Sequence, residues 1–151
     1  MAADFTRRRL GGECPPAAEL SRRQIVVVGV PLSIVILGYV LLGAGIAVTT
    51  WAQAVNRFFE PGVRLQRERG QHVIDSGPYA IVRHPGYVCA LMIFAGLALA
   101  LASWWALIPA AWASAILILR TSREDALLQA ELDGYADYAR RTRFRLLPGL
   151  W

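Results

Sequence analysis

The hydrophobic residues of this chain gather in two long uncharged runs and do not alternate with polar residues. One run extends from Gln24 to Asn56 and the other from Gly86 to Leu119, which gives 33 and 34 residues without a formal charge. A hydrocarbon core of about 30 Å is crossed by about 20 apolar residues in a helix. The pattern therefore predicts an all-α integral membrane protein.

The first run predicts one long membrane-spanning helix over residues 24–50. Pro31 is tolerable inside it, because a helix in lipid cannot easily give up its backbone hydrogen bonds. We expect the helix to continue beyond Trp51 to Phe59 as an interfacial extension. The sequence Glu60-Pro61-Gly62 is predicted to stop it.

The second run is too long for a single crossing, because one helix of that length would measure about 51 Å. It therefore predicts a hairpin of two short helices over residues 86–120, with halves at 86–102 and 104–120. The turn is expected at Ala102-Ser103-Trp104-Trp105, where two indoles suit the membrane interface. A single kinked helix is the alternative. Together the two runs predict about three transmembrane helices.

The remaining segments are polar and define the rest of a single domain over residues 21–151. Residues 1–20 are expected to form a flexible N-terminal arm. Residues 60–84 read as a polar connector on the cytosolic side, with a turn at Ser76-Gly77-Pro78. Residues 121–151 are predicted to form an amphipathic helix and a tail that lies on membrane lipids.

Charge and composition narrow the class of protein. The chain is 56% hydrophobic and carries a net charge of +5, with arginine as its sole cationic residue type. The arginines flank the apolar runs instead of lining one face, so no nucleic-acid partner is expected. Basic residues beside spans mark the cytoplasmic side. This predicts a bacterial inner-membrane protein, or an endoplasmic-reticulum protein if the source is eukaryotic.

No metal site is expected, because His72 and His84 are the only histidines and the two cysteines lie far apart in the sequence, at Cys14 and Cys89. No G-x-G-x-x-G loop is present either, so any nucleotide-like ligand must bind without that device.

Ionisable clusters stand at both ends of the second run. Arg83-His84 precede it and Arg123-Glu124-Asp125 follow it, so a hairpin would bring the two clusters to one membrane face. Pro85 fits the first helical position, and the free N–H groups of that helix start attract an anion such as a carboxylate. Glu124 is expected to accept hydrogen bonds from ribose hydroxyls or an amine. Asp125 points about 100° away on the helix and need not share that role.

Beyond the second run the pattern stays helical. A stripe at spacings of four and three would form one helix face if the helix continues past Gly134, with the members Glu124, Leu128, Glu131, Tyr135 and Tyr138.

An ordered set of motifs appears along the chain: Gly77-Pro78-Tyr79, Arg83-His84-Pro85-Gly86-Tyr87, an apolar hairpin, Arg123-Glu124-Asp125, then Tyr135-x-x-Tyr138 with Leu147-Pro148. Over about residues 55–151 this set resembles the C-terminal core of the isoprenylcysteine carboxyl methyltransferase family and its phospholipid N-methyltransferase relatives. Two departures stand out. The family often has Glu-Glu in place of Glu124-Asp125, and Phe-Gly in place of Glu131-Leu132.

The resemblance implies S-adenosylmethionine (SAM) as methyl donor, bound at the cytosolic surface under a lipid-facing tunnel. It implies that the His84-Pro85-x-Tyr87 segment and Glu124 hold the cofactor. We expect further cofactor contacts from Tyr79, Arg83, Gly86, Tyr135 and Tyr138. In our hypothesis Arg83 and His84 hold the methionine carboxylate, and Arg140 neutralises an acceptor carboxylate, so Arg83, Glu124 and Arg140 are the expected reaction residues. Three spans are fewer than family members usually show, which suggests a short or truncated member, or a homo-oligomer that completes the site.

The function expected from these features is methyl transfer to a lipid-like or prenylated acceptor, foremost carboxyl methylation of an isoprenylcysteine-type substrate. Three alternatives stay open: N-methylation of a phospholipid amine, an NADPH-dependent sterol-type reductase, and a membrane scaffold without enzymatic activity.

Overall fold

The computed structural model describes residues 30–60, 62 and 65–151, and this part of the chain is helical with no strand. The predicted all-α class is confirmed for these residues. The α-helices are α3 (Leu32–Val55), α4 (Pro85–Ala100), α5 (Leu107–Glu131) and α6 (Tyr135–Arg141). Short 3-10 helices are η1 (Arg67–Arg69), η2 (Gly77–Ala80) and η3 (Trp104–Ala106). The expected arm at residues 1–20 lies outside the described residues.

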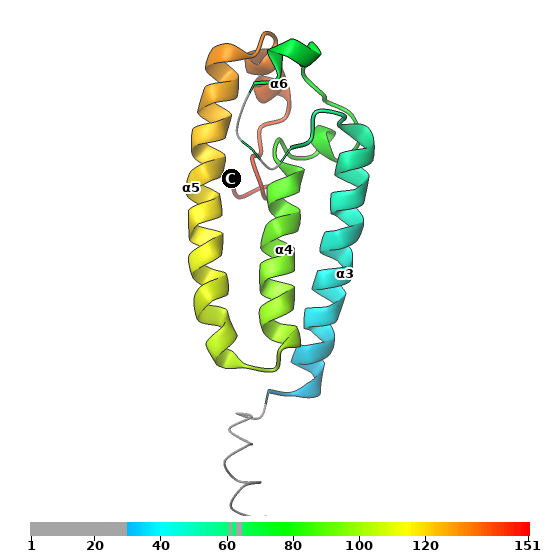
Figure 1. The fold of residues 1–151 in the computed structure, drawn as a ribbon, viewed down its shortest axis with the longest axis vertical. Helices are drawn as coiled ribbons and strands as arrows, with labels where there is room; N and C mark the ends of the chain where they lie inside the picture. The colour runs from blue at the N-terminus through cyan, green and yellow to red at the C-terminus, as the bar shows by residue number, and fades with distance from the viewer. Residues whose placement is uncertain (1–29, 61, 63–64) are drawn as a thin grey trace, which may run out of the picture.

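Three long helices lie side by side and carry the polar segments at one end (Figure 1). α3 leads to the connector, which begins at Asn56 in the structure because the helix ends at Val55. α4 then returns toward the start of α3, and α5 runs back again. The connector, α6 and the C-terminal segment therefore gather at the end where α4 begins. The turn between α4 and α5 lies at the opposite end, as Figure 1 shows.

α3 differs from the predicted span at both ends. It begins at Leu32 because Pro31, which takes an extended backbone conformation, occupies the N-cap. It ends at Val55, beyond the expected limit at residue 50 but before the expected extension to Phe59. The cause is Asn56, whose Oδ1 accepts a hydrogen bond from the Phe58 N–H at 2.9 Å and so replaces the next helical turn. The predicted stretch 24–29 lies outside the described residues.

The helical hairpin is confirmed, with its turn at the expected position. α4 ends at Ala100, Ala102 adopts a left-handed conformation with φ 52°, and η3 starts at Trp104. Trp105 is 72% exposed at this turn, as an interfacial indole would be. The second half is longer than predicted, because α5 continues past residue 120 to Glu131 through a stretch rich in good helix formers.

The predicted stripe through Gly134 is wrong. Gly134 adopts φ 79° and separates α5 from α6, so no single helix face joins Glu124 to Tyr138. Glu131 lies on the surface at the end of α5 and pairs with Arg67 of the connector at 3.2 Å. Tyr135 and Tyr138 are buried and belong to α6.

α3 and α4 approach each other closely through three glycines. A Cβ atom added at Gly38 would lie 2.5 Å from the Ala100 backbone nitrogen, and one at Gly96 would lie 2.7 Å from the Leu42 nitrogen. A Cβ at Gly45 would meet the Ile93 side chain at 2.9 Å. Small residues allow such backbone contact between helices in lipid. This pair therefore packs backbone against backbone.

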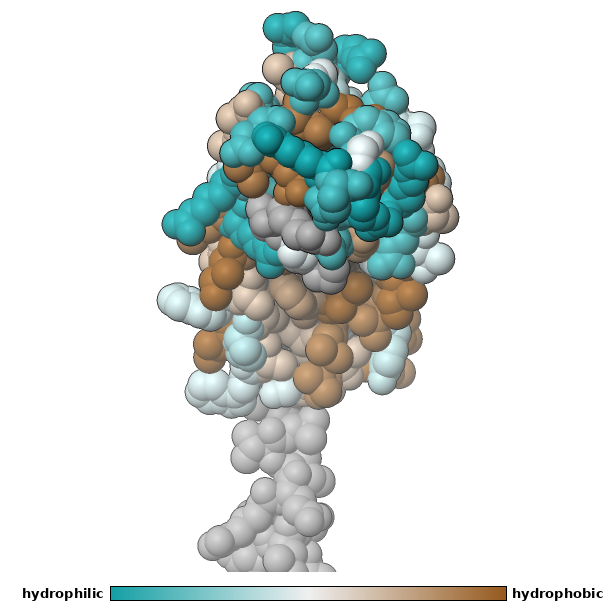
Figure 2. Space-filling view, turned by 45° about the horizontal axis from the view of Figure 1, so that its top comes forward, coloured by the Kyte–Doolittle hydropathy of each residue, from teal (hydrophilic) through white to brown (hydrophobic). Residues whose placement is uncertain are grey.

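The outer surface of the bundle is apolar, below a polar cap (Figure 2). Two helical stretches, Leu32–Val55 and Trp104–Glu131, are long and apolar enough to cross a membrane. Only 11% and 6% of their most apolar windows are buried within the protein. Their large side chains therefore face outward, as in a membrane protein. α4 is apolar but shorter, with 16 residues.

Candidate functional site

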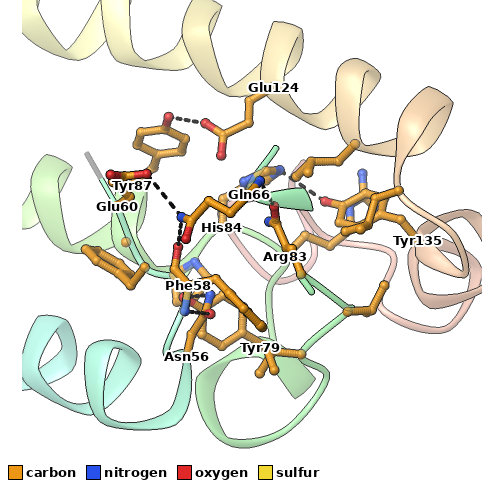
Figure 3. A pocket seen from close by; sticks show the side chains of 18 of the residues that line it. Asn56, Phe58, Glu60, Gln66, Tyr79, Arg83, His84, Tyr87, Glu124 and Tyr135 are labelled. Carbon is orange, nitrogen blue, oxygen red and sulfur yellow. Dashed lines mark hydrogen bonds between the residues drawn. The ribbon is translucent and has the colours of Figure 1, made fainter. Parts of the chain in front are cut away.

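A cavity of about 350 Å³ opens at the polar end of the bundle. This volume falls in the range of roughly 300–1,000 Å³ that is common for small-molecule sites. Its walls come from the end of α3, the connector, η2, the first turn of α4, and one face of α5 and α6. Figure 3 shows many of these side chains around one space. The lining residues are Asn56, Phe58, Phe59, Glu60, Gly62, Gln66, Gln71, His72, Val73, Ile74, Tyr79, Arg83, His84, Pro85, Gly86, Tyr87, Ala90, Leu117, Glu124, Leu127, Leu128, Leu132, Tyr135 and Tyr138.

Asp125 is the centre of a buried network beside this cavity. Its side chain is fully buried, and its two oxygens accept six hydrogen bonds. Arg83 donates two of them from Nε and Nη2, at 2.8 and 2.9 Å. Arg145 Nε and Gln129 Nε2 donate to Oδ2 at 2.9 and 2.8 Å. The position of Asp125 therefore agrees with the prediction that it points away from Glu124 on the helix.

Arg83 is held on all sides by the protein itself. Besides its paired contact with Asp125, its Nη1 lies within hydrogen-bonding distance of the carbonyl oxygens of Ala139, Thr142 and Arg143, at 3.4, 3.0 and 3.0 Å. A planar guanidinium has five N–H donors. Nearly all of them are used here, so Arg83 fixes the C-terminal segment against α4 rather than offering its charge to a ligand.

His84 forms the N-cap of α4 and fixes where this helix begins. Its Nε2 donates to Asp125 Oδ1 at 3.1 Å, and its backbone N–H donates to the Arg145 carbonyl at 3.0 Å. The neighbouring Arg83 N–H donates to the Phe144 carbonyl at 2.9 Å. Pro85 then occupies the first helical position, as predicted. The C-terminal segment is thus held by backbone hydrogen bonds to the two residues that lead into α4.

Glu124 faces the cavity on the α5 side, while Asp125 points into the buried network. The Glu124 carboxylate accepts a hydrogen bond from the Tyr87 hydroxyl, which comes from the first turn of α4. Figure 3 shows this pair across the upper wall of the cavity. The Tyr87 ring also lies 5.8 Å from the His84 ring, centroid to centroid. The predicted neighbourhood of His84, Tyr87 and Glu124 is therefore present.

Gly86 lies against an aromatic ring of the connector. A Cβ atom added at Gly86 would lie 2.7 Å from Cε2 of Phe59. The glycine therefore lets the Phe59 ring pack against the first turn of α4, where both residues line the cavity.

Three tyrosines, Tyr79, Tyr135 and Tyr138, line the inner wall of the cavity. The Tyr138 hydroxyl donates to the Tyr79 carbonyl at 2.7 Å, and Asn56 Nδ2 donates to the Tyr79 hydroxyl at 3.0 Å. The Tyr135 hydroxyl donates to Asp125 Oδ1 at 3.0 Å. Burial raises the pKa of Tyr135, and the nearby Asp125 charge raises it further. Burial also raises the pKa of Tyr138, so both hydroxyls remain protonated donors.

Residues 33–132, which are 100 of 151 residues, match the phospholipid methyltransferase family. The chain belongs to the phospholipid methyltransferase family. The matched region contains α3, the connector, α4 and α5, together with His84, Tyr87 and Glu124. The sequence-based assignment to this group of membrane methyltransferases is therefore confirmed.

One curated relative also matches part of the chain. An 81-residue stretch is 38% identical to the cobalt-zinc-cadmium resistance protein CzcN of Cupriavidus metallidurans, and it covers 52% of this chain and 37% of that protein. The chain thus aligns with well under half of the relative's length. No solved structure matches the chain significantly. Within residues 30–60, 62 and 65–151, no group of three or more His, Cys, Asp or Glu side chains is suited to hold a metal ion.

One expected reaction residue of this family member lies away from the cavity. Arg140 is on the exposed face of α6, where it pairs with Asp137 and lines a separate surface depression with Asp75 and Arg141. The reason is helical geometry: Tyr138 faces the cavity, and a residue two positions later lies about 200° around the helix. A direct contact between Arg140 and a ligand in the cavity does not follow from this placement.

No pattern in the sequence marks the connector wall of the cavity. Phe58, Glu60, Gln66 and His72 all line it, yet they belong to no recognised motif and show no periodicity. The places of Arg145 and Gln129 in the buried network were not predicted either. Both side chains bond to Asp125, and this network forms only when α5 and the C-terminal segment pack together. A fully buried glutamine in a polar connector is visible only in three dimensions.

Proposed function

We propose that this protein is an SAM-dependent methyltransferase that acts on a lipid-like acceptor at the cytoplasmic membrane surface. Family membership supports methyl transfer over the reductase and scaffold alternatives. The single observation that carries the proposal is the shared cavity of two distant motifs. His84 and Tyr87 at the start of α4 and Glu124 on α5 face one space at the polar end of an apolar bundle.

The residues around the cavity fit SAM, which is a cation with an aromatic base and a carboxylate. Glu124 supplies a negative charge, and the rings of Tyr79, Tyr87 and Phe59 supply surfaces for an aromatic base or a sulfonium. The start of α4 favours the carboxylate, because helix N-termini attract anions. Arg83 acts in this proposal by positioning that helix start. When bound, SAM supplies an electrophilic methyl group, which forms a bond to the acceptor while its bond to sulfur breaks and the electron pair stays on sulfur.

The charges of the cavity favour an amine acceptor over a carboxylate acceptor. Glu60 and Glu124 both line the cavity, while the charge of Arg83 is compensated by Asp125. An acceptor carboxylate would be repelled by these two groups and has no proton to lose. An ammonium group would be attracted by them, and it must give up a proton before its nitrogen can react. The phospholipid amine is therefore our preferred acceptor among the predicted alternatives.

The lower wall of the cavity suits the apolar part of a lipid. Ala90 of α4 and Leu117 of α5 line it on the side of the apolar bundle. Leu127, Leu128 and Leu132 cover the side toward α6 and exclude water from the reacting groups. A headgroup can thus enter the cavity while its chains remain beside α4 and α5.

The decisive experiment is transfer of a labelled methyl group from SAM to vesicles that contain phosphatidylethanolamine. Wild-type protein is expected to label the lipid, and Glu124→Gln and Tyr87→Phe are each expected to lower kcat/KM at least tenfold. Gly43→Ala is the matched control, since a Cβ there meets nothing within 4 Å and the site is distant. Isothermal titration with SAM and with NADPH should show binding of SAM alone. Absence of both SAM binding and lipid labelling in the wild type would overturn the proposal.

A further inference from the structure

The wall of the cavity that the connector provides is built around one buried polar side chain. Gln66 is 1% exposed. Its Nε2 donates to the Phe58 carbonyl at 2.9 Å and to Glu60 Oε2 at 3.1 Å, while its Oε1 accepts from Arg69 Nη1 at 2.6 Å. Its backbone N–H donates to Gln71 Oε1 at 2.6 Å. Such a saturated amide holds a fixed local structure, because a buried group without partners would be costly.

The consequence of this arrangement is a defined position for Glu60. The connector leaves α3 at Asn56, and the contact between Gln66 and Glu60 closes the loop that follows. Figure 3 shows the Glu60 carboxylate on the connector side of the cavity and Glu124 on the α5 side. The cavity is therefore bordered by carboxylates from two separate elements. Glu60 is exposed and lies toward the mouth, whereas Glu124 is half-buried.

One aromatic residue beside Glu60 suits the same kind of ligand. Phe59 is half-buried, lines the cavity and packs against Gly86 at the first turn of α4. An aromatic face next to a carboxylate attracts alkylammonium groups by cation–π and charge interactions together. The Phe58 ring is 5% exposed and already has the Arg57 guanidinium 4.9 Å from its centroid, so Phe58 contributes only the carbonyl that Gln66 holds.

We propose that Glu60, positioned by Gln66, binds the ammonium headgroup of the acceptor and thereby selects amine acceptors over carboxylates. This inference rests on the proposed function for its biological meaning. It assigns Glu124 and Glu60 to different ligands: Glu124 to the cofactor side near α4, and Glu60 to the acceptor at the mouth. Gln66 is a positioning residue, since it acts through Glu60.

The test uses a headgroup analogue that cannot be methylated. Binding of hexyltrimethylammonium to full-length protein in detergent is measured by calorimetry without SAM, with hexanoate as the anionic counterpart. Glu60→Gln is expected to weaken ammonium binding about three- to fivefold, as for a partly exposed charge pair. SAM affinity should change less than about twofold, and hexanoate should not bind more weakly than to the wild type.

Gln66→Leu tests the positioning role through coupling. It should weaken ammonium binding in the same direction, and the double variant should be no worse than Glu60→Gln alone, because both changes remove one interaction. Glu60→Asp should restore part of the affinity, and it carries the test if Gln66→Leu does not fold. Unchanged ammonium binding in Glu60→Gln would overturn the inference, as would an equal loss of SAM affinity. Failure of the proposed function is distinct, because it appears as missing SAM binding in the wild type.

Discussion

Glu124 and Asp125 are adjacent on α5, but Glu124 lines the cavity whereas Asp125 belongs to a buried network. Asp125 is fully buried and accepts bonds from Arg83, Arg145, His84, Gln129 and Tyr135. Glu124 is half-buried, contacts Tyr87 and lines the cavity. The first should therefore matter for stability and the second for ligand binding, although both belong to the same sequence motif.

Asp125→Asn is expected to lower the free energy of unfolding by about 3–5 kcal/mol, because it leaves the buried Arg83 guanidinium without its counter-charge. Thermal unfolding in detergent measures this effect. Glu124→Gln serves as the control at the next position and should unfold within a few degrees of the wild type. Equal stability of the two variants would contradict the assignment of Asp125 to the structural network.

The buried tyrosines of α6 predict a loss of stability at high pH. Because burial raises the folded-state pKa of Tyr135 and Tyr138 above the ordinary value of about 10, the folded state keeps protons that the unfolded state releases. Stability is fully present below pH 10 and falls as the pH rises above it. The sequence contains no lysine to obscure this titration. Tyr135→Phe and Tyr138→Phe should flatten the decline of melting temperature between pH 9 and 11, whereas an unchanged slope would exclude these groups as its source.

At the scale of helices, the contact between α3 and α4 depends on backbone approach. Gly38→Ala would place a methyl group 2.5 Å from the Ala100 nitrogen, and backbone cannot yield as a side chain can. The substitution should destabilise the bundle by about 1–3 kcal/mol. Gly43→Ala lies on the same helix with no atom within 4 Å, so it should be neutral or slightly stabilising. Comparable melting temperatures for both variants would argue against tight packing at Gly38.

The sequence predicts the presence of the helices better than the residues at which they begin and end. Uncharged runs of 33 and 34 residues fix the presence of α3 and of the hairpin, since lipid imposes their length and polarity. The end of α3 at Val55 depends on an Asn56 side-chain bond, and the break before α6 depends on Gly134 in a left-handed conformation. Alternative positions for these helix ends differ little in energy, and no periodic pattern in the sequence marks them.

The candidate site, too, could be predicted from the sequence only in part. The start of α4 at Pro85 follows from proline chemistry, and the fold-back of the hairpin brings His84 near Glu124 as expected. The role of Arg83 could not be foreseen, because its partners lie 42 to 60 residues away in sequence. Which charged group meets a ligand and which meets another buried charge is decided by long-range packing.

At the scale of the whole molecule, the hairpin predicts that its turn and the site lie on opposite membrane faces. Cysteines introduced by Ser76→Cys at the site and Ser103→Cys at the turn test this in cells, with Cys14 replaced by serine and Cys89 left buried. A membrane-impermeant thiol reagent should label Ser103→Cys in intact cells. Ser76→Cys should react only after permeabilisation, because the site faces the cytoplasm in our proposal. Labelling of both from one side would show that the hairpin does not cross the bilayer.

The pairing of Phe144 and Arg145 with the entry into α4 bears on how the protein is made. A translocon can insert α3, α4 and α5 as soon as each has left the ribosome, yet Arg83 obtains its last carbonyl partners only when residues 139–143 have been synthesised. Until then the nascent chain is anchored in the membrane, but its cavity is incomplete. An interrupted translation product would therefore be inserted in the membrane but would lack the candidate site.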